Sequence, residues 1–325
     1  MSELLSEYGL FLAKTLTIVI LIALLIRSSI SSKSRVQAAE KLEIKHLNKY
    51  YERMTRTLMM HLMPKKEFVK KLKSEKAHKK KKKYTKRVFV LDFHGDIRAT
   101  AVASLREEIT AVLSVATPED EILLRLESGG GLVHEYGLAA SQLERIRKKQ
   151  IPLIIAVDKI AASGGYMMAC VGDRIIAAPF AIIGSIGALM QVPNFHRLLD
   201  KHGIDFEQIK AGELKRTVTL FGINTDQDRE LAKKQVEDIH QLFKEFVARY
   251  RPDMDLSQTA TGQHWHAIQA KKLNLIDDLE TSDDYLAEAC KTANLYKVTY
   301  TVKKTFAERF LARTQAASDR TLGPF

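Results

Sequence analysis

Cysteine is scarce in this chain of 325 residues, and the two that are present, Cys170 and Cys290, have no metal-binding or redox spacing. Both lie in apolar or helical stretches of sequence. We predict that they fill the core, with a disulfide as the alternative. Their pattern excludes a cysteine-bound metal site and a thiol redox motif, and it does not identify the compartment.

Nucleotide-binding motifs are also missing. The glycines of "ESGGGLVHE" (127–135) stand where a predicted strand ends and a helix begins, but no Lys-Ser/Thr pair and no spaced glycine fingerprint accompanies them. Backbone N–H groups at such a turn suit a phosphate or a developing oxyanion. Taken alone, the motif is better explained as a tight turn.

Long apolar runs are limited to residues 10–26, "LFLAKTLTIVILIALLI". The stretch is long enough to cross most of a bilayer as a helix. Its acidic start and the lack of a small-residue cleavage site argue against a cleaved signal peptide. We therefore predict an uncleaved, single-pass membrane anchor over residues 1–27. The basic residues that follow it, Arg27, Lys33 and Arg35, favour a cytoplasmic catalytic domain.

The formal net charge of +12 is concentrated in "KKEFVKKLKSEKAHKKKKKYTKR" (65–87). We interpret residues 28–86 as a helical, lysine-rich extension that links the anchor to the rest of the chain. Its basic tract is suited to anionic lipid head groups. Without interleaved aromatic residues or a recognisable module, nucleic acid is not an expected partner.

Residues 87–290 are expected to form an α/β domain with a largely parallel sheet, and 291–325 a C-terminal tail. Apolar strand patterns alternate with helical periodicity in units of about thirty residues, which is typical of right-handed βαβ crossovers. The predicted strands are 87–93, 121–128, 151–158 and 173–179, and the predicted helices between them are 99–116 and 132–150.

A serine at a second strand-to-helix turn is the candidate nucleophile. In "DKIAASGGYMMACV" (158–171), Ser163 follows a buried strand and precedes Gly164 and Gly165. This placement resembles a nucleophile elbow, and the N–H of Gly164 could face the oxygen of an attacked carbonyl. Two glycine turns at neighbouring strand ends could together form an oxyanion hole.

A third glycine-rich stretch, "AIIGSIGALM" (181–190), is strand-like. It is either a sheet segment in close backbone contact or a ledge on which an extended peptide pairs. The residues concerned are Gly184, Ser185, Ile186 and Gly187.

The proton acceptor for such a serine is not evident among the histidines. None stands at the expected distance after Ser163, although His94 and His134 lie near strand ends and stay open as bases. A lysine can replace histidine where burial lowers its pKa. The candidate lysines are Lys159, Lys210 and Lys215.

Five motifs in order, "ESGGGLVHE", "AASGGYMMA", "IGSIGALM", "KAGELKRT" and "AIQAKKLNLIDDL", resemble the signal peptide peptidase A (SppA) family of serine peptidases. The resemblance implies the ClpP/crotonase-like fold and a Ser-Lys dyad of Ser163 and Lys215. It places the oxyanion hole at Gly130, Gly131 and Gly164.

The same resemblance implies no cofactor, a homo-oligomeric ring, apolar or signal-peptide-like substrates and a periplasmic catalytic domain in the bacterial inner membrane. It therefore disagrees with the flanking charges about the side of the membrane. The chain also departs from the family pattern, since Gly129 replaces a proline in the first glycine turn and Arg216 and Thr217 follow Lys215. These changes leave open which group donates to the oxyanion and which residue orients the lysine.

Two other functions compete with this one. A crotonase-type acyl-CoA enzyme would share the fold, but it would need a catalytic carboxylate and has no use for Ser163 or a membrane anchor. An inactive membrane scaffold of the same fold would not need an intact Ser163 and Lys215.

Overall fold

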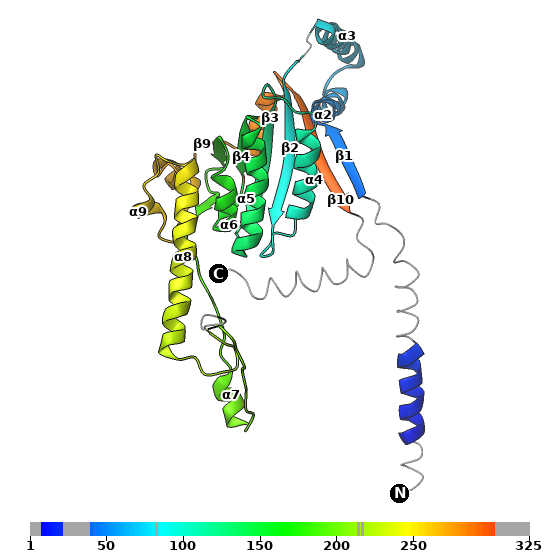
Figure 1. Cartoon of the computed structure of the whole chain (residues 1–325). Coiled ribbons are helices and arrows are strands. Elements are labelled where there is room, and N and C mark those ends of the chain that lie inside the picture. Colours follow the sequence, from blue (N-terminus) through cyan, green and yellow to red (C-terminus); the bar gives the residue numbers. More distant parts are fainter. Residues whose placement is uncertain (1–7, 22–39, 82–83, 213–214, 216–217, 303–325) are drawn as a thin grey trace. The chain divides into compact units, whose positions relative to one another are not determined.

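The computed structural model describes residues 8–21, 40–81, 84–212, 215 and 218–302 (Figure 1). Residues 42–300 form one compact unit, and it is this unit that is described below. Residues 8–21 are helical, and the remainder of the predicted anchor lies outside the described residues. Among the helices that are described, none combines the length and the apolar character needed to cross a bilayer.

The centre of the unit is a largely parallel sheet, which confirms the predicted α/β class. Five neighbouring pairs, from β10–β2 through β2–β3, β3–β4 and β4–β6 to β6–β9, are parallel. The longest register joins β2 and β3, from Val88 opposite Glu121 to Gly95 opposite Ser128. In order across the sheet the strands are β1 (Glu40–His46), β10 (Asn294–Val302), β2 (Arg87–Gly95), β3 (Glu121–Ser128), β4 (Leu153–Val157), β6 (Arg174–Ala177) and β9 (Asp278–Leu279).

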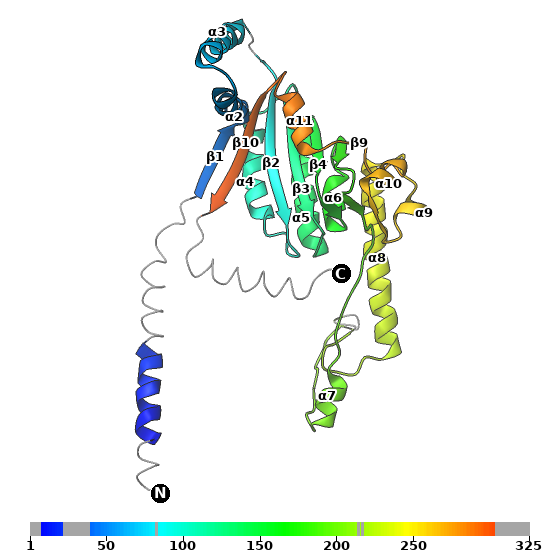
Figure 2. The same cartoon turned by 180° about the vertical axis from the view of Figure 1, so that it is seen from behind.

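Both faces of the sheet are covered, which explains why its central strands carry apolar residues on both faces. On one face, Phe89, Leu91 and Phe93 pack in the main core with α4 (Val102–Leu113), α5 (Val133–Lys148) and α6 (Gly164–Ala169), the helices in front of the sheet in Figure 1. On the other face, the alternate residues Val88 and Val90 pack with residues of α2 (Leu47–Leu62) and α11 (Ser282–Ala289), visible in Figure 2.

A smaller group of strands branches from the carboxyl end of β3. Ser128 at the end of β3 pairs with Ala161 of β5 (Ile160–Ala162). Strand β5 pairs in parallel with β7 (Ile182–Gly184), which pairs antiparallel with β8 (His264–His266). This branch brings the ends of β3, β5 and β7 to one place.

The ends of the sequence differ from expectation in two respects. Within the extension expected to be helical, Glu40–His46 form strand β1, and strand β10 lies in the expected C-terminal tail. Leu42 and Ile44 alternate with charged residues in "EKLEIKH", a two-residue period typical of a strand. Further along the extension, α2 and α3 (Lys65–Lys81) are helical.

Between β7 and the long helix α8 (Asp226–Tyr250), the chain leaves the sheet and forms the short helix α7 (His196–Lys201) (Figures 1 and 2). The start of α8 is fixed by a capping box between Thr225 and Asp228. We call residues 185–225 the connecting segment. Two further short helices, α9 (Leu256–Thr259) and α10 (Ala267–Lys272), follow α8.

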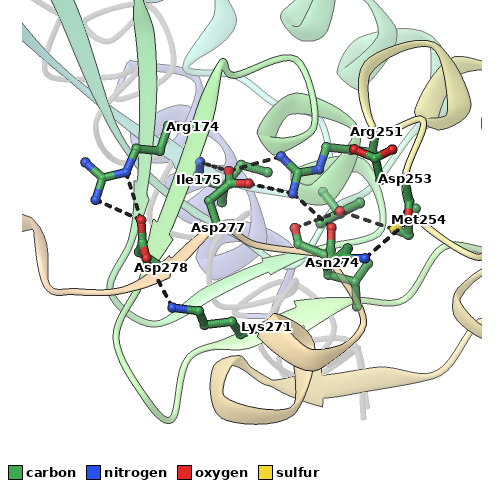
Figure 3. Close-up of polar contacts among 11 residues, drawn as sticks. Arg174, Ile175, Arg251, Asp253, Met254, Lys271, Asn274, Asp277 and Asp278 are labelled. Carbon is green, nitrogen blue, oxygen red and sulfur yellow. Dashed lines mark hydrogen bonds and ion pairs between the residues drawn. The ribbon is translucent and has the colours of Figure 1, made fainter.

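The far end of α8 is fixed to the body by a bidentate ion pair (Figure 3). The Arg251 guanidinium donates to both oxygens of Asp277, at 2.9 and 3.0 Å, and to the carbonyl of Asn274. Asp277 also accepts the N–H of Ile175 in β6 at 2.7 Å. Bidentate arginine–carboxylate pairs of this kind fix the relative orientation of the two side chains as well as their distance.

Candidate active site

Ser163 stands between β5 and α6 in a strained backbone conformation. Its φ and ψ are 50° and −119°, a region that a residue with a Cβ rarely adopts and that costs about 1–3 kcal/mol. Two backbone bonds hold it there: the Ser163 N–H donates to the Gly184 carbonyl at 2.8 Å, and the Ser163 carbonyl accepts from Met167 N–H at 2.9 Å. The side chain does not cap α6. The half-buried hydroxyl is thus presented by its turn, as in a nucleophile elbow.

The first glycine turn lies directly against this serine. A Cβ placed on Gly130 would lie 2.7 Å from the nitrogen of Gly164 and 2.8 Å from the Cβ of Ser163. Gly130 also has a φ of +92°, which favours glycine. The structure therefore brings the two predicted glycine turns together.

The two adjacent glycines of this turn have different surroundings. The N–H of Gly130 donates to the Ser128 hydroxyl at 3.1 Å, so it is already engaged. At Gly131, a Cβ would lie 2.0 Å from the carbonyl oxygen of Ile97, so only glycine fits. No acceptor within the described residues is bonded to the Gly131 N–H.

Tyr136, a residue that the sequence reasoning did not single out, supports both turns. The Tyr136 hydroxyl donates to the Asp96 carbonyl at 2.7 Å and lies 2.5 Å from the Ser128 hydroxyl. Because its one proton is directed at Asp96, the Ser128 hydroxyl must be the donor between the two. A continuous chain of hydrogen bonds then runs from Gly130 N–H through Ser128 and Tyr136 to Asp96.

The ring of Tyr136 lies beneath the second turn. A Cβ on Gly164 would lie 2.4 Å from Cγ of Tyr136, so the helix start rests directly on this ring. Tyr136 is completely buried, and burial raises its pKa to about 12. It therefore stays a neutral hydrogen-bond donor. The sequence signal was a tyrosine one helical turn after "GGGL".

The third glycine-rich stretch lies beside Ser163, and part of its backbone is occupied. Gly184, with φ +104°, is packed against the ring of Trp265. The Ser185 N–H donates to the Gln263 carbonyl at 2.8 Å, and the Ile186 carbonyl accepts from Gly262 N–H at 3.0 Å. The predicted ledge is therefore already hydrogen-bonded on the side that faces residues 262–264.

Lys215 lies in the connecting segment, away from the strand ends that carry Ser163 in the sequence. It is exposed in the connecting segment, where its N–H donates to the Gly212 carbonyl at 3.1 Å. Among the backbone hydrogen bonds of the described residues, those of Ser163 go to Gly184 and Met167 and that of Lys215 goes to Gly212, so none joins Lys215 to Ser163. Arg216 and Thr217, considered as neighbours that could orient the amine, lie outside the described residues.

The other candidate bases are engaged elsewhere or exposed. Lys159 bonds both oxygens of Glu127, at 3.0 and 3.1 Å, and His94 lies 3.5 Å from the same carboxylate. His134 is largely exposed and lies 3.7 Å from Glu135. Lys210 is exposed in the connecting segment.

The described residues also define the positions of the cysteines and of possible metal ligands. Cys170 is buried in the main core, as predicted, and no disulfide joins it to Cys290. Over the described ranges, no group of three or more His, Cys, Asp or Glu side chains is arranged to hold a metal ion.

Comparison with known proteins agrees with the motifs. Residues 3–143 match the N-terminal region of peptidase family S49, and residues 145–296 match peptidase family S49. A protein of Haemophilus influenzae named "Probable protease SohB" is 46% identical over 95% of this chain and 93% of its own length. A second "Probable protease SohB", from Buchnera aphidicola subsp. Acyrthosiphon pisum, is 45% identical over 98% of this chain and 97% of its own length. With both relatives aligned over nearly their whole length and the family's two regions matched in order, this chain belongs to peptidase family S49.

Proposed function

We propose that this member of the family is a membrane-anchored serine endopeptidase whose nucleophile is Ser163 and whose general base is Lys215. The observation that carries the proposal is the strained Ser163 turn set against Gly130 and Gly164. Such strain is retained where the surrounding structure enforces it for function. The ClpP/crotonase-like fold is consistent with the parallel sheet and its branch at β5.

The reaction is acyl transfer. Neutral Lys215 takes the Ser163 proton while the Oγ attacks the peptide carbonyl and forms the C–O bond. The protonated lysine then gives its proton to the leaving amine as the C–N bond breaks. Water, activated by the same lysine, attacks the acyl-enzyme and releases the acid product and free Ser163. No cofactor takes part in this sequence.

The oxyanion that forms in both tetrahedral intermediates needs two or more N–H donors. Gly131 and Gly164 are the best placed, because the N–H of Gly130 is directed at Ser128. We assign Gly130 the role of allowing the close approach of the two turns. The Gly130 N–H could donate to the oxyanion only after breaking its hydrogen bond to the Ser128 hydroxyl.

We infer that the substrate is an extended apolar peptide, of the signal-peptide-like or unfolded type. Gly184, Ser185, Ile186 and Gly187 would contact it from the side not paired to residues 262–264. The connecting segment adds exposed apolar side chains near this strand, with Leu189 78%, Met190 45% and Val192 38% exposed.

The dyad needs Lys215 to approach Ser163, and burial is what leaves a lysine amine neutral. Two arrangements provide this: a movement of the connecting segment, or a lysine from a second copy in a homo-oligomeric ring. Large exposed apolar residues on this segment, among them Ile209 at 99% and Ile223 at 70%, support an assembly that covers it. Mixing Ser163→Ala with Lys215→Ala protein distinguishes the two, because only a lysine supplied by a second copy restores labelling of Ser163.

We propose a single-pass anchor at residues 1–27 in the bacterial inner membrane, based on the apolar run at 10–26. The catalytic domain is assigned to the periplasm by family resemblance, against the flanking basic residues. Protease accessibility of residues 87–290 in spheroplasts tests the side of the membrane.

The proposed chemistry is tested by labelling the detergent-solubilised protein with a serine-reactive fluorophosphonate from about pH 6 to about pH 10. Labelling should be lost in Ser163→Ala, should be strongly reduced in Lys215→Ala and should increase with pH. Labelling that survives Lys215→Ala would reassign the base to His94 or His134. A folded wild-type protein that does not label at all would favour the inactive scaffold.

A further inference from the structure

Helix α2 has an apolar face of which only the first part is packed on the sheet. Leu47 and Tyr51 pack against the second core, beside Leu295 and Leu286. Met54, Leu58 and Leu62 continue the same face and are 50%, 63% and 78% exposed. Exposure therefore rises steadily along one side of the helix.

These five residues form one stripe by helical geometry. At 100° per residue, positions 47, 51, 54, 58 and 62 fall within an arc of about 80°. The exposed part is thus a continuation of a core-facing stripe and is not a scatter of surface residues, which would need no explanation.

The helix cannot turn this stripe inward, because its start is fixed. Asn48 is buried, and its amide donates to the Ala293 carbonyl at 2.9 Å while its oxygen accepts the Leu295 N–H at 2.7 Å. These bonds join the first turn of α2 to β10 and to the residue that precedes it. The rotation of α2 about its own axis is therefore set.

The side of α2 opposite the stripe carries basic residues, together with Met60, which is 58% exposed, and α3 is rich in lysine. Residues 47–81 contain twelve lysines and arginines against three glutamates, a surplus of nine in a chain with a net charge of +12. On α2, Lys49, Arg53 and Arg56 lie about 120–180° away from the stripe. A helix with one apolar and one basic face is the pattern of a segment that lies in a membrane interface.

We propose that α2 rests on anionic lipid, with Met54, Leu58 and Leu62 inserted among the acyl chains and the basic residues of α2 and α3 near the head groups. Nucleic acid would use the positive charge but leave the apolar stripe in water. A second copy of the same face would bring two strongly basic surfaces together. This inference rests on the proposed membrane anchor, which keeps the chain at a bilayer.

The covalent tether permits this contact. Residues 22–39 separate the helix at 8–21 from β1, and eighteen residues span at most about 60 Å. Reach therefore does not prevent α2 from touching the bilayer that holds the anchor.

The test places a photo-crosslinking amino acid at Leu58 in the full-length protein, reconstituted in nanodiscs with or without anionic phosphatidylglycerol. The matched control carries the same amino acid at Leu138, which is 40% exposed on α5. We expect lipid adducts at position 58 several-fold above those at 138, and a several-fold fall in discs of zwitterionic lipid only. In a second variant, the photo-crosslinking amino acid is placed at Met54 and Leu58→Glu is added. This charge in the stripe should reduce the lipid adduct at position 54.

The outcomes are separable from the anchor itself. Protein that resists alkaline extraction from membranes but gives no lipid adduct at 58 would overturn the lipid contact and leave the anchor in place. Protein that is extracted by alkali yet crosslinks to lipid at position 58 would overturn the anchor and leave the lipid contact in place. An adduct at 58 to a second protein chain would assign the stripe to an interface between copies.

Discussion

Gly130 and Ser163 approach each other so closely that a side chain on the glycine would lie 2.8 Å from the Cβ of the serine. Two turns that are 33 residues apart in sequence therefore act as one structural element. The approach depends on the absence of a single methyl group.

Replacing Gly130 with alanine should abolish labelling of Ser163. The new Cβ would collide with backbone atoms of Ala162 and Gly164, and φ +92° is strained for any residue with a Cβ. Gly137→Ala is the control, because nothing lies within 4 Å of its Cβ position. In the middle of α5 this second change should stabilise the protein by about 1 kcal/mol, as measured by urea unfolding, with labelling unchanged.

Ser163→Gly should be more stable than Ser163→Ala by about 1 kcal/mol. Both variants lose the hydroxyl, but only glycine relieves the strain at φ 50° and ψ −119°. Thermal unfolding of the two inactive proteins side by side measures the difference. Equal stability would show that the turn is not strained in solution.

Tyr136→Phe should slow fluorophosphonate labelling about tenfold, equivalent to about 1.4 kcal/mol of barrier. The ring beneath Gly164 is kept, but Ser128 loses its partner and Gly130 its fixed orientation. Tyr250→Phe is the matched control, because the Tyr250 hydroxyl bonds Glu144 at 2.5 Å and takes no part in the glycine turns. Burial raises the pKa of Tyr250 to about 12 as well. Both variants should lose about 1 kcal/mol of stability, and only the first should lose labelling rate.

Glu108 should make the protein less stable as the pH rises. The residue is 4% exposed, and its carboxyl group accepts the Tyr300 N–H at 2.8 Å. Burial raises its pKa from 4.5 to about 7. Asp92 also raises this pKa, and Lys297 lowers it. The folded state favours the protonated form. This contribution is therefore complete below about pH 4.5, is lost as the pH rises toward 7, and amounts to about 3 kcal/mol at most.

Urea unfolding at about pH 5 and about pH 8 measures this loss. Glu108→Gln keeps an acceptor for Tyr300 and should remove most of the pH dependence. Glu107→Gln, one residue away and exposed, should retain it. A wild-type protein equally stable at both pH values would contradict the raised pKa.

The central fold could be predicted from the sequence because burial of a sheet on both faces produces apolar strand patterns that are easily recognised. Strand β4 is a continuous apolar run, β3 contains the apolar run 122–124, and α5 begins one residue after three glycines. Strand β1 was missed because it has only two apolar residues, Leu42 and Ile44, and pairs at an edge. Its two-residue alternation was the available signal.

The site was predictable in part, for a physical reason. Ser163, Gly130 and Gly164 lie at the ends of strands, so sheet topology places them together. Tyr136 supports them from inside a helix, where a buried tyrosine is indistinguishable in sequence from ordinary core packing. The position of Lys215 depends on how the connecting segment folds, and no strand order determines that.

Ser163 and Lys215 are carried by different parts of the fold, and this has a consequence for the newly made protein. The nucleophile and its glycine turns are built into the sheet, whereas the lysine is carried on a segment outside it. With the proposed roles, a single chain would be latent until Lys215 reaches Ser163, because the strained serine would until then lack its proposed base. Folding would then be safe from self-cleavage, and activity would begin only when the lysine is brought to the serine.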